Sequence, residues 1–142
     1  LARVARFSHD GPAAGVPLSV ARSAVSLSLD VNAKAILCAT TSGSTAALIA
    51  RFRPATPIIG VTSDAQTCRR LNLVWGVRPL LIGAAADTDR MMEATIEAVS
   101  AHGLLRPGDR VILTAGVPVN TPGNTNLIRV HTVGQPMRPA LT

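Results

Sequence analysis

Aromatic residues are scarce in this chain, which has no tyrosine, two phenylalanines and one tryptophan among its 142 residues. Because hydrophobic residues still make up 47% of the sequence, the core must be built from alanine, valine, leucine and isoleucine. Short aliphatic side chains favour helices packed tightly on a sheet over a barrel centred on aromatic rings. The length suits one domain with a full core. We therefore expect a single layered domain.

Lysine is nearly absent, so the net charge of +6 comes from arginine, with Lys34 as the one exception. The arginines are scattered. The densest pairs, Arg51 with Arg53 and Arg69 with Arg70, fall late in expected helices, where cations complement the helix dipole. No group of aromatic residues forms a platform on which bases could stack. We expect no nucleic-acid partner.

Cysteine is limited to Cys38 and Cys68, which form no CxxC pair. Two reduced, mostly buried thiols are typical of a cytoplasmic protein. No apolar run approaches the roughly 18 residues that a membrane helix needs, and no signal peptide is visible. We expect no membrane partner and a cytoplasmic location. The sequence begins at Leu1, which we interpret as the start of a processed or excised piece of a longer protein.

Apolar runs and apolar periodicity alternate along the chain. Short apolar runs predict strands over residues 35–39, 57–62, 76–82, 110–116 and 126–133. Helices are expected over residues 17–32, 44–53, 63–72 and 87–103. Outside these elements, residues 1–15 resemble a linker and 136–142 a flexible tail, which leaves 16–135 as the folded domain.

Finer expectations follow for two helices. In the first, the spacing of Val20, Ala24, Leu27 and Val31 predicts the buried face. In the third, Ser63 and Gln66 match a capping box, with Cys68 and Leu71 turned inward.

The alternation of strand and helix predicts an α/β fold with a mostly parallel sheet. Pro79 places the third strand at an edge, where a missing N–H costs least. No helix separates the last two strands, so the fifth is expected to be antiparallel to the fourth. The predicted order is 3-2-1-4-5. Ligands of such sheets bind beyond the carboxyl ends of the strands where the winding reverses, here between strands 1 and 4.

A cluster of hydroxyls follows strand 1 at this point. The stretch "TTSGST" has five hydroxyl side chains in six positions around Gly43, directly before a helix. Hydroxyls and free amides at a helix start match a phosphate group. A simple helix cap by Ser42 or Ser44 is the alternative. The second loop at the reversal is "GVPVNTPGN" after strand 4.

Other ligand chemistry has little support. Neither G-x-x-x-x-G-K-S/T nor G-x-G-x-x-G occurs. The three histidines, His9, His102 and His131, lie apart in sequence, which disfavours a metal site or a catalytic triad and suggests ordinary surface or interface positions. The acidic residues of 87–97 follow a solvated helix face.

Two long segments resemble the C-terminal domain of bacterial pyruvate kinases. They are "LDVNAKAILCATTSGSTAALIARFRPATPIIGVTSDAQTCRRLNLVWGVRPLLI" and "GLLRPGDRVILTAGVPVNTPGNTNLIRVHTV", and the similarity extends from about Pro17 to Val133. The resemblance implies a three-layer α/β/α domain that binds a phosphorylated allosteric effector and forms a subunit interface of a homotetramer. The parent enzyme transfers a phosphoryl group from phosphoenolpyruvate to ADP with Mg²⁺ and K⁺. Its chemistry lies in a barrel and a lid domain outside this sequence, so we expect no catalytic residue, cofactor or metal site here.

The resemblance also implies the effector site. The first loop would hold the phosphate, the second would close over it, and the strand Asn126–Val133 would pack across a two-fold axis. The site residues are Thr40, Thr41, Ser42, Gly43, Ser44 and Thr45 in the first loop and Gly116, Asn120, Thr121, Pro122, Gly123 and Asn124 in the second.

The chain departs from relatives activated by fructose 1,6-bisphosphate. Those carry a cation where this chain has Thr41, and a Trp and an Arg where it has Ala84 and Met91, although Arg90 is adjacent. We therefore expect a monophosphate effector, such as AMP or a hexose or pentose monophosphate. A free-standing relative with its own small-molecule role, or a pure oligomerisation module, are the alternatives.

Overall fold

The protein is described by a computed structural model that covers residues 15–116 and 125–137. Its sheet consists of β1 (Ala35–Ala39), β2 (Ile58–Thr62), β3 (Val77–Leu81), β4 (Arg110–Gly116) and β5 (Thr125–Thr132). The strand order is β3-β2-β1-β4-β5. Neighbouring strands are parallel except β4 and β5, which are antiparallel. The predicted order and the orientation of the last strand are both confirmed.

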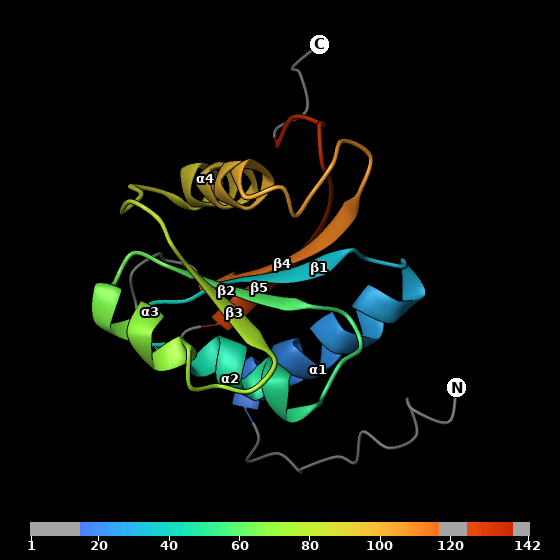
Figure 1. Cartoon of the computed structure of the whole chain (residues 1–142). Coiled ribbons are helices and arrows are strands. Elements are labelled where there is room, and N and C mark those ends of the chain that lie inside the picture. Colours follow the sequence, from blue (N-terminus) through green and yellow to red (C-terminus); the bar gives the residue numbers. More distant parts are fainter. Residues whose placement is uncertain (1–14, 117–124, 138–142) are drawn as a thin grey trace.

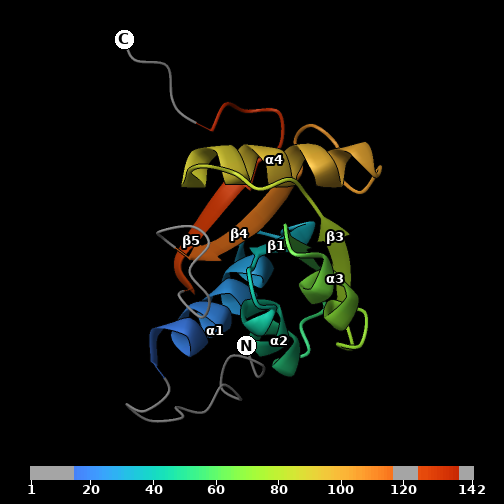
Figure 2. The same cartoon turned by 90° about the vertical axis from the view of Figure 1, so that its left-hand side faces the viewer.

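Four helices cover the two faces of this sheet. They are α1 (Gly15–Asp30), α2 (Ser44–Arg51), α3 (Ala65–Leu71) and α4 (Thr88–Ala101). Figure 1 shows α1, α2 and α3 on one face and α4 alone on the other, and Figure 2 shows the same three layers from the side. The fold is the predicted three-layer α/β/α domain.

Alternating side chains of β1 divide the core in two. Ile36 and Cys38 pack with residues of α1 and α2, whereas Ala35 and Leu37 pack with residues of α4. A central parallel strand is buried on both sides, which explains why β1 is an uninterrupted apolar run.

The predicted buried face of α1 is confirmed in part. Ala24 is buried, and Leu27 and Val31 are half-buried and pack against the core, but this stripe does not extend to Val20. The buried residues are Leu18, Ala21, Ala24, Val25 and Ser28. Apolar residues occur all around this helix, so their spacing alone did not select one stripe. The structure buries the stripe with small residues, which let the helix approach the sheet closely, and Ser28 satisfies its hydroxyl by donating to the Val25 carbonyl at 2.7 Å.

The predicted cap of α3 was also displaced by one residue. Asp64, rather than Ser63, occupies the cap position, and its carboxylate accepts a hydrogen bond from the Gln66 amide at 2.9 Å. The inner side is formed by Thr67 and Leu71, whereas Cys68 is only half-buried. The capping-box pattern located the start of the helix but selected the wrong acceptor.

Replacement of the cap gives a direct test of this assignment. We expect Asp64→Ala to lower the free energy of unfolding by about 0.5–2 kcal/mol, because the Gln66 amide loses its acceptor. Ser63→Ala is the matched control and should change it by less than about 0.5 kcal/mol. Urea unfolding monitored by circular dichroism measures the free energy of unfolding of both variants. A larger decrease for Ser63→Ala than for Asp64→Ala would indicate that Ser63 caps the helix, as the sequence predicted.

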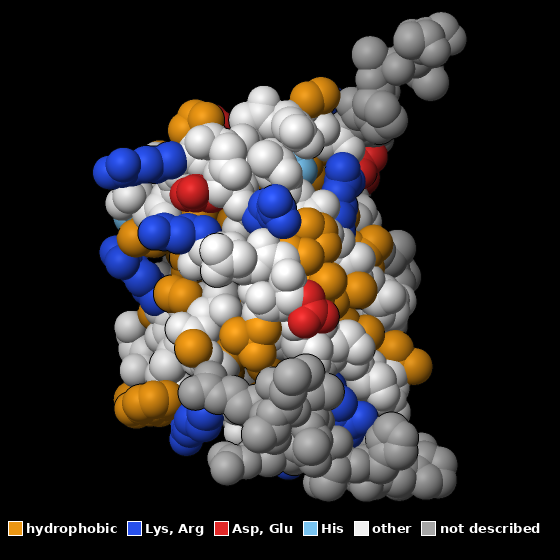
Figure 3. Space-filling view, turned by 90° about the vertical axis from the view of Figure 1, so that its right-hand side faces the viewer, with side chains coloured by type: hydrophobic (Ala, Val, Ile, Leu, Met, Phe, Trp, Pro, Cys, Tyr) orange, Lys and Arg blue, Asp and Glu red, His pale blue; other side chains and the backbone are white. Residues whose placement is uncertain are grey.

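Charged side chains are distributed over the surface. Figure 3 shows basic side chains on one face among neutral and hydrophobic ones, with a few acidic ones between them. In the described part of the chain no helix is long and apolar enough to cross a membrane.

Candidate functional site

The hydroxyl loop, residues 40–44, connects the end of β1 to the start of α2. β1 lies between β2 and β4, and the connections from β1 and β4 diverge from this position. The loop therefore lies at the carboxyl end of the parallel strands, at the reversal of the winding. The turn into α2 is made by Gly43, whose φ of +89° lies in the left-handed region that favours glycine.

Hydrogen bonds within the loop fix its shape. The Gly43 amide donates to the Thr40 hydroxyl at 2.8 Å, and the Ser44 amide donates to the Ser42 hydroxyl at 3.3 Å. The Ser42 hydroxyl in turn donates to that of Ser44 at 3.0 Å. Both serines are exposed. The loop thus exposes the hydrogen-bonded hydroxyls of Ser42 and Ser44 to solvent, and internal hydrogen bonds hold its backbone in place.

The helix-cap alternative accounts for only part of this arrangement. Gly43 occupies the cap position of α2 and has no side chain to cap it, while the Ser42 hydroxyl accepts a hydrogen bond from the Ser44 amide at the start of the helix. The amides of Thr45 and Ala46 lie in the first helical turn, where backbone donors have no partner within the helix. Together with the positive end of the helix dipole, they form a donor set suited to an anion.

The second predicted loop begins and ends beside the first. The hydroxyl of Thr45 is hydrogen-bonded to that of Thr125, the first residue of β5, and both side chains are buried. Thr125 also pairs with Gly116, the last residue of β4. Of the predicted second loop, Gly116 therefore lies at the site. Asn120, Thr121, Pro122, Gly123 and Asn124 lie outside the described residues.

A cation that the sequence analysis did not select lies behind the hydroxyl loop. The buried Thr67 of α3 donates its hydroxyl to the Thr41 carbonyl at 2.8 Å. The Arg70 guanidinium donates to the same hydroxyl at 3.0 Å. The sequence interpretation assigned Arg70 to the helix dipole. The signal that could have identified Arg70 is its spacing to Thr67. The two residues lie one helical turn apart on α3, the helix that follows β2, which neighbours β1.

The positions at which the family resemblance implies a second phosphate offer no such donors. Ala84 is exposed and carries no polar side-chain atom, and Met91 packs against the core beneath α4. The adjacent Arg90 directs its Nε toward the Asp87 carboxylate, 3.8 Å away. Among the described residues, the hydroxyls and free amides suited to an anion therefore lie at the hydroxyl loop and not at these positions.

The described residues show neither a reactive Cys38 thiol nor a cluster of metal ligands. Burial raises the pKa of the Cys38 thiol to about 12, so the thiol stays neutral and unreactive. Across the described residues, no three His, Cys, Asp or Glu side chains come together as metal ligands.

One histidine was placed wrongly by the sequence interpretation. His131 is buried, at 5% exposure, rather than on the surface, and burial lowers its pKa, with the Arg129 charge as a smaller cause. His102 is exposed, with Nδ1 2.9 Å from the Ala98 carbonyl oxygen, and His9 lies outside the described residues. The burial of His131 was missed because the alternation of residues along a strand does not show which face of an antiparallel edge strand a helix covers.

Comparison with known proteins identifies the family. The family model described as "Pyruvate kinase, alpha/beta domain" matches residues 18–131. The chain belongs to this family. The match includes the hydroxyl loop, both sides of the second loop, the first four strands and all but the last residue of β5.

Similar proteins of this family are pyruvate kinases. The chain is 39% identical over 116 residues to a pyruvate kinase of Sporosarcina psychrophila, which covers 82% of this chain and 20% of that protein. It is 40% identical over 115 residues to one of Geobacillus stearothermophilus, covering 81% and 20%. A crystal structure of a pyruvate kinase from Cryptosporidium parvum superposes with a TM-score of 0.74 at 30% identity, over 83% of this chain and 23% of that one. The chain thus spans about one fifth of the length of the curated relatives it matches.

Proposed function

We propose that this domain is the regulatory part of a pyruvate kinase and that its hydroxyl loop binds the phosphate of a monophosphorylated effector. The parent reaction would convert phosphoenolpyruvate and ADP to pyruvate and ATP in the cytoplasm, with catalytic residues, Mg²⁺ and K⁺ in the part of the enzyme outside this chain. The match to this family supports the parent enzyme, because the similar proteins are pyruvate kinases of which the matched segment covers about one fifth.

The observation that carries the effector site is the convergence of donors at the hydroxyl loop. Hydroxyls of Ser42 and Ser44, amides of the first turn of α2 and the Thr45–Thr125 pair meet at one end of the sheet. A hydrogen bond to a charged group contributes about 1.5–3 kcal/mol. Four or five of them exceed the cost of ordering a small ligand and correspond to roughly micromolar affinity.

The monophosphate preference rests on the second-phosphate positions. Neither Ala84 nor Met91 has a cationic or donor side chain, and the Arg90 guanidinium faces Asp87. We expect calorimetric titration of this chain to show tighter binding of AMP, ribose 5-phosphate or glucose 6-phosphate than of fructose 1,6-bisphosphate. Tighter binding of the bisphosphate would overturn the preference.

Removal of single hydroxyls gives the second test of the loop. We expect Ser42→Ala to weaken binding of the tightest monophosphate at least about tenfold, because it removes one charge-assisted hydrogen bond worth about 1.5–3 kcal/mol. We expect Thr45→Ala to weaken it indirectly, because it removes the hydrogen bond to Thr125 that holds the start of α2 against β5. Thr45→Ser keeps the hydroxyl and should retain binding, and Ser23→Ala on α1 is the control for an exposed serine. Unchanged dissociation constants in both alanine variants would contradict the site.

Regulation would follow from a preference of the effector for one of two states of the assembled enzyme. A ligand shifts such an equilibrium only by its differential affinity, and coupling between sites is typically about 1–3 kcal/mol. The exposed edge of the sheet supports the assembly part of the proposal. β5 pairs with β4 on one side, and its Val130 is 41% exposed.

An oligomerisation module is the second candidate function, favoured by this same edge strand. An exposed edge can pair with a second copy of the chain, with or without a ligand in the loop. Val130→Lys should then lower the oligomeric state of the enzyme measured by sedimentation velocity and leave monophosphate binding intact. If monophosphates do not bind this chain and Val130→Lys dissociates the enzyme, the domain serves oligomerisation alone.

A further inference from the structure

Helix α3 packs against the hydroxyl loop through two of its residues. The buried Thr67 donates its hydroxyl to the Thr41 carbonyl at 2.8 Å. Methyl groups of Thr67 and Leu71 lie 3.5 and 3.2 Å from where a Cβ on Gly43 would be. The helix therefore contacts both the peptide group at the start of the loop and the glycine at its turn. A change on α3 can alter the loop without touching a ligand bound there.

Arg70 acts on the hydroxyl of Thr67 that makes this contact. Its guanidinium donates to that hydroxyl at 3.0 Å. A threonine hydroxyl has one hydrogen to donate, and two acceptors are within its reach, the Thr41 carbonyl at 2.8 Å and the Asp64 carboxylate at 3.3 Å. A donor on the hydroxyl oxygen polarises the group and strengthens the hydrogen bond that it donates in turn. Arg70 therefore strengthens the hydrogen bond from Thr67 to Thr41.

The hydrogen bond to Thr41 sets the direction of the next backbone amide. In a planar trans peptide the carbonyl and the following N–H point in opposite directions. Because the Thr41 carbonyl is held toward α3, the Ser42 amide points away from α3. None of the described residues accepts a hydrogen bond from this amide, and Ser42 is exposed. The contact with α3 thus leaves the Ser42 amide available to a ligand of the loop.

We propose that Arg70 is a positioning residue of the effector site, which acts through Thr67 to hold the Thr41–Ser42 peptide group with its amide toward the phosphate. This inference rests on the proposed function of the hydroxyl loop. Arg70 does not touch the ligand, so its whole contribution to binding passes through the hydroxyl of Thr67. It would make α3 the helix that tunes the affinity of the loop.

A double-mutant cycle tests whether Arg70 acts through Thr67. In calorimetric titrations of this chain we expect Arg70→Met to weaken binding of the tightest monophosphate at least about threefold and Thr67→Val at least about fivefold. The double variant should bind no more than about twofold more weakly than Thr67→Val alone, because the hydroxyl on which Arg70 acts is already absent. A larger further loss would mean that Arg70 contacts the ligand directly and would overturn the proposal.

Conservative variants separate the hydrogen bonds from packing. Arg70→Lys keeps a donor and Thr67→Ser keeps the hydroxyl, so both should restore most of the binding that Arg70→Met and Thr67→Val lose. Arg69→Met removes the same charge from the neighbouring exposed position and should change binding by less than about twofold. Circular dichroism and thermal unfolding confirm that each variant is folded. Equal losses in Arg69→Met and Arg70→Met would overturn the role of Arg70.

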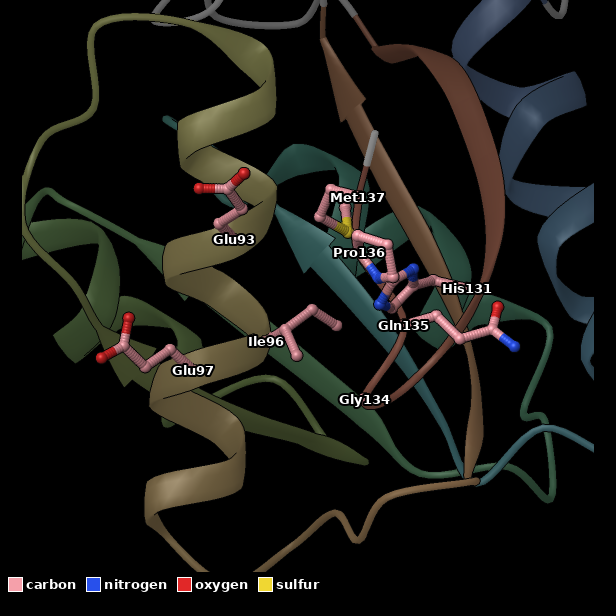
Figure 4. Close-up of a pocket in the computed structure, with 8 residues that line it drawn as sticks. All are labelled: Glu93, Ile96, Glu97, His131, Gly134, Gln135, Pro136 and Met137. Carbon is pink, nitrogen blue, oxygen red and sulfur yellow. The ribbon is translucent and has the colours of Figure 1, made fainter. Parts of the chain in front are cut away.

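The cavity in Figure 4 supplies a distant control. It has a volume of about 410 Å³ and is lined by residues of α4 and of the turn after β5, among them the exposed Glu97. Figure 1 shows α4 on the opposite face of the sheet from α3. Glu97→Gln alters the net charge by one unit, as Arg70→Met does, but on this other face. Screening by salt should then leave monophosphate binding within about twofold. A loss as large as that of Arg70→Met would contradict a local role for Arg70.

Spectra of the ligand-free chain keep this test apart from that of the proposed function. Arg70→Met and Thr67→Val should shift the Thr41 carbonyl carbon and the Ser42 amide of the ¹³C,¹⁵N-labelled chain in the same direction, whereas Arg69→Met should leave both signals in place. Unchanged signals in Arg70→Met would overturn the positioning role even where monophosphates bind. Absence of monophosphate binding by the unaltered chain would instead overturn the proposed function, and the effector role of Arg70 with it.

Discussion

Leu71→Ala should lower the free energy of unfolding by about 2–5 kcal/mol, the usual cost of emptying a fully packed leucine position. Leu71 is 2% exposed and fills the space left by two glycines. Its Cδ1 lies 2.8 Å from where a Cβ on Gly60 would be, and its Cδ2 lies 3.2 Å from where one on Gly43 would be. The leucine therefore packs under both β2 and the hydroxyl loop.

The matched control is Leu73→Ala, two residues further along the chain. Leu73 is 88% exposed, so its truncation should change stability by less than about 0.5 kcal/mol. A double-mutant cycle adds a sharper criterion. Gly60→Ala should destabilise the wild-type protein because the new Cβ meets Leu71, and it should cost less in the Leu71→Ala background. Additive costs in urea unfolding would contradict the packing described here.

Gly43→Ala should weaken monophosphate binding by at least about tenfold, the equivalent of roughly 1.4 kcal/mol, and should also destabilise the domain. At a φ of +89° an L side chain is strained, and the added Cβ would meet the Leu71 methyl group at 3.2 Å. Relief of this contact would displace the turn that aims the first amides of α2. Binding is measured by calorimetry and stability by urea unfolding.

Gly76→Ala is the control that separates backbone strain from the site. Gly76 has nearly the same conformation, with a φ of +84°, but nothing lies within 4 Å of an added Cβ. It should lose about 1–2 kcal/mol of stability and bind monophosphates like the unaltered chain. Equal binding losses in both variants would mean that the loss at Gly43 reflects general destabilisation.

The sequence predicted the framework of the fold because the strands have strong local signals. The run "AILCA" coincides with β1, and "RVILTAG" coincides with β4. Pro79 correctly marked β3 as an edge strand, and the short connection before β5 correctly indicated an antiparallel pair. The missing N–H of Pro79 and the short connection before β5 each leave few alternative positions for the strand in the sheet.

The errors occurred where neighbouring elements decide the outcome. The buried face of α1 depends on which small residues fit against the sheet, and His131 is buried because α4 and the turn after β5 cover it. At the site, the sequence located the hydroxyl loop, and topology brought Gly116 beside it. Thr125 could not be found in this way, because its contact with Thr45 joins β5 to α2. Arg70 could have been found only from its spacing to Thr67 on α3, which the sequence interpretation did not use.

The central claim is that the hydroxyl loop holds the phosphate of a monophosphate effector. Amide chemical shifts of the ¹⁵N-labelled chain, followed during addition of glucose 6-phosphate, ribose 5-phosphate or AMP, test it most directly. We predict saturable shifts for at least one of these compounds that are largest at the amides of Gly43, Ser44, Thr45 and Ala46 and extend to Thr125. The absence of saturable shifts with all three, or shifts confined to residues away from this loop, would contradict the account.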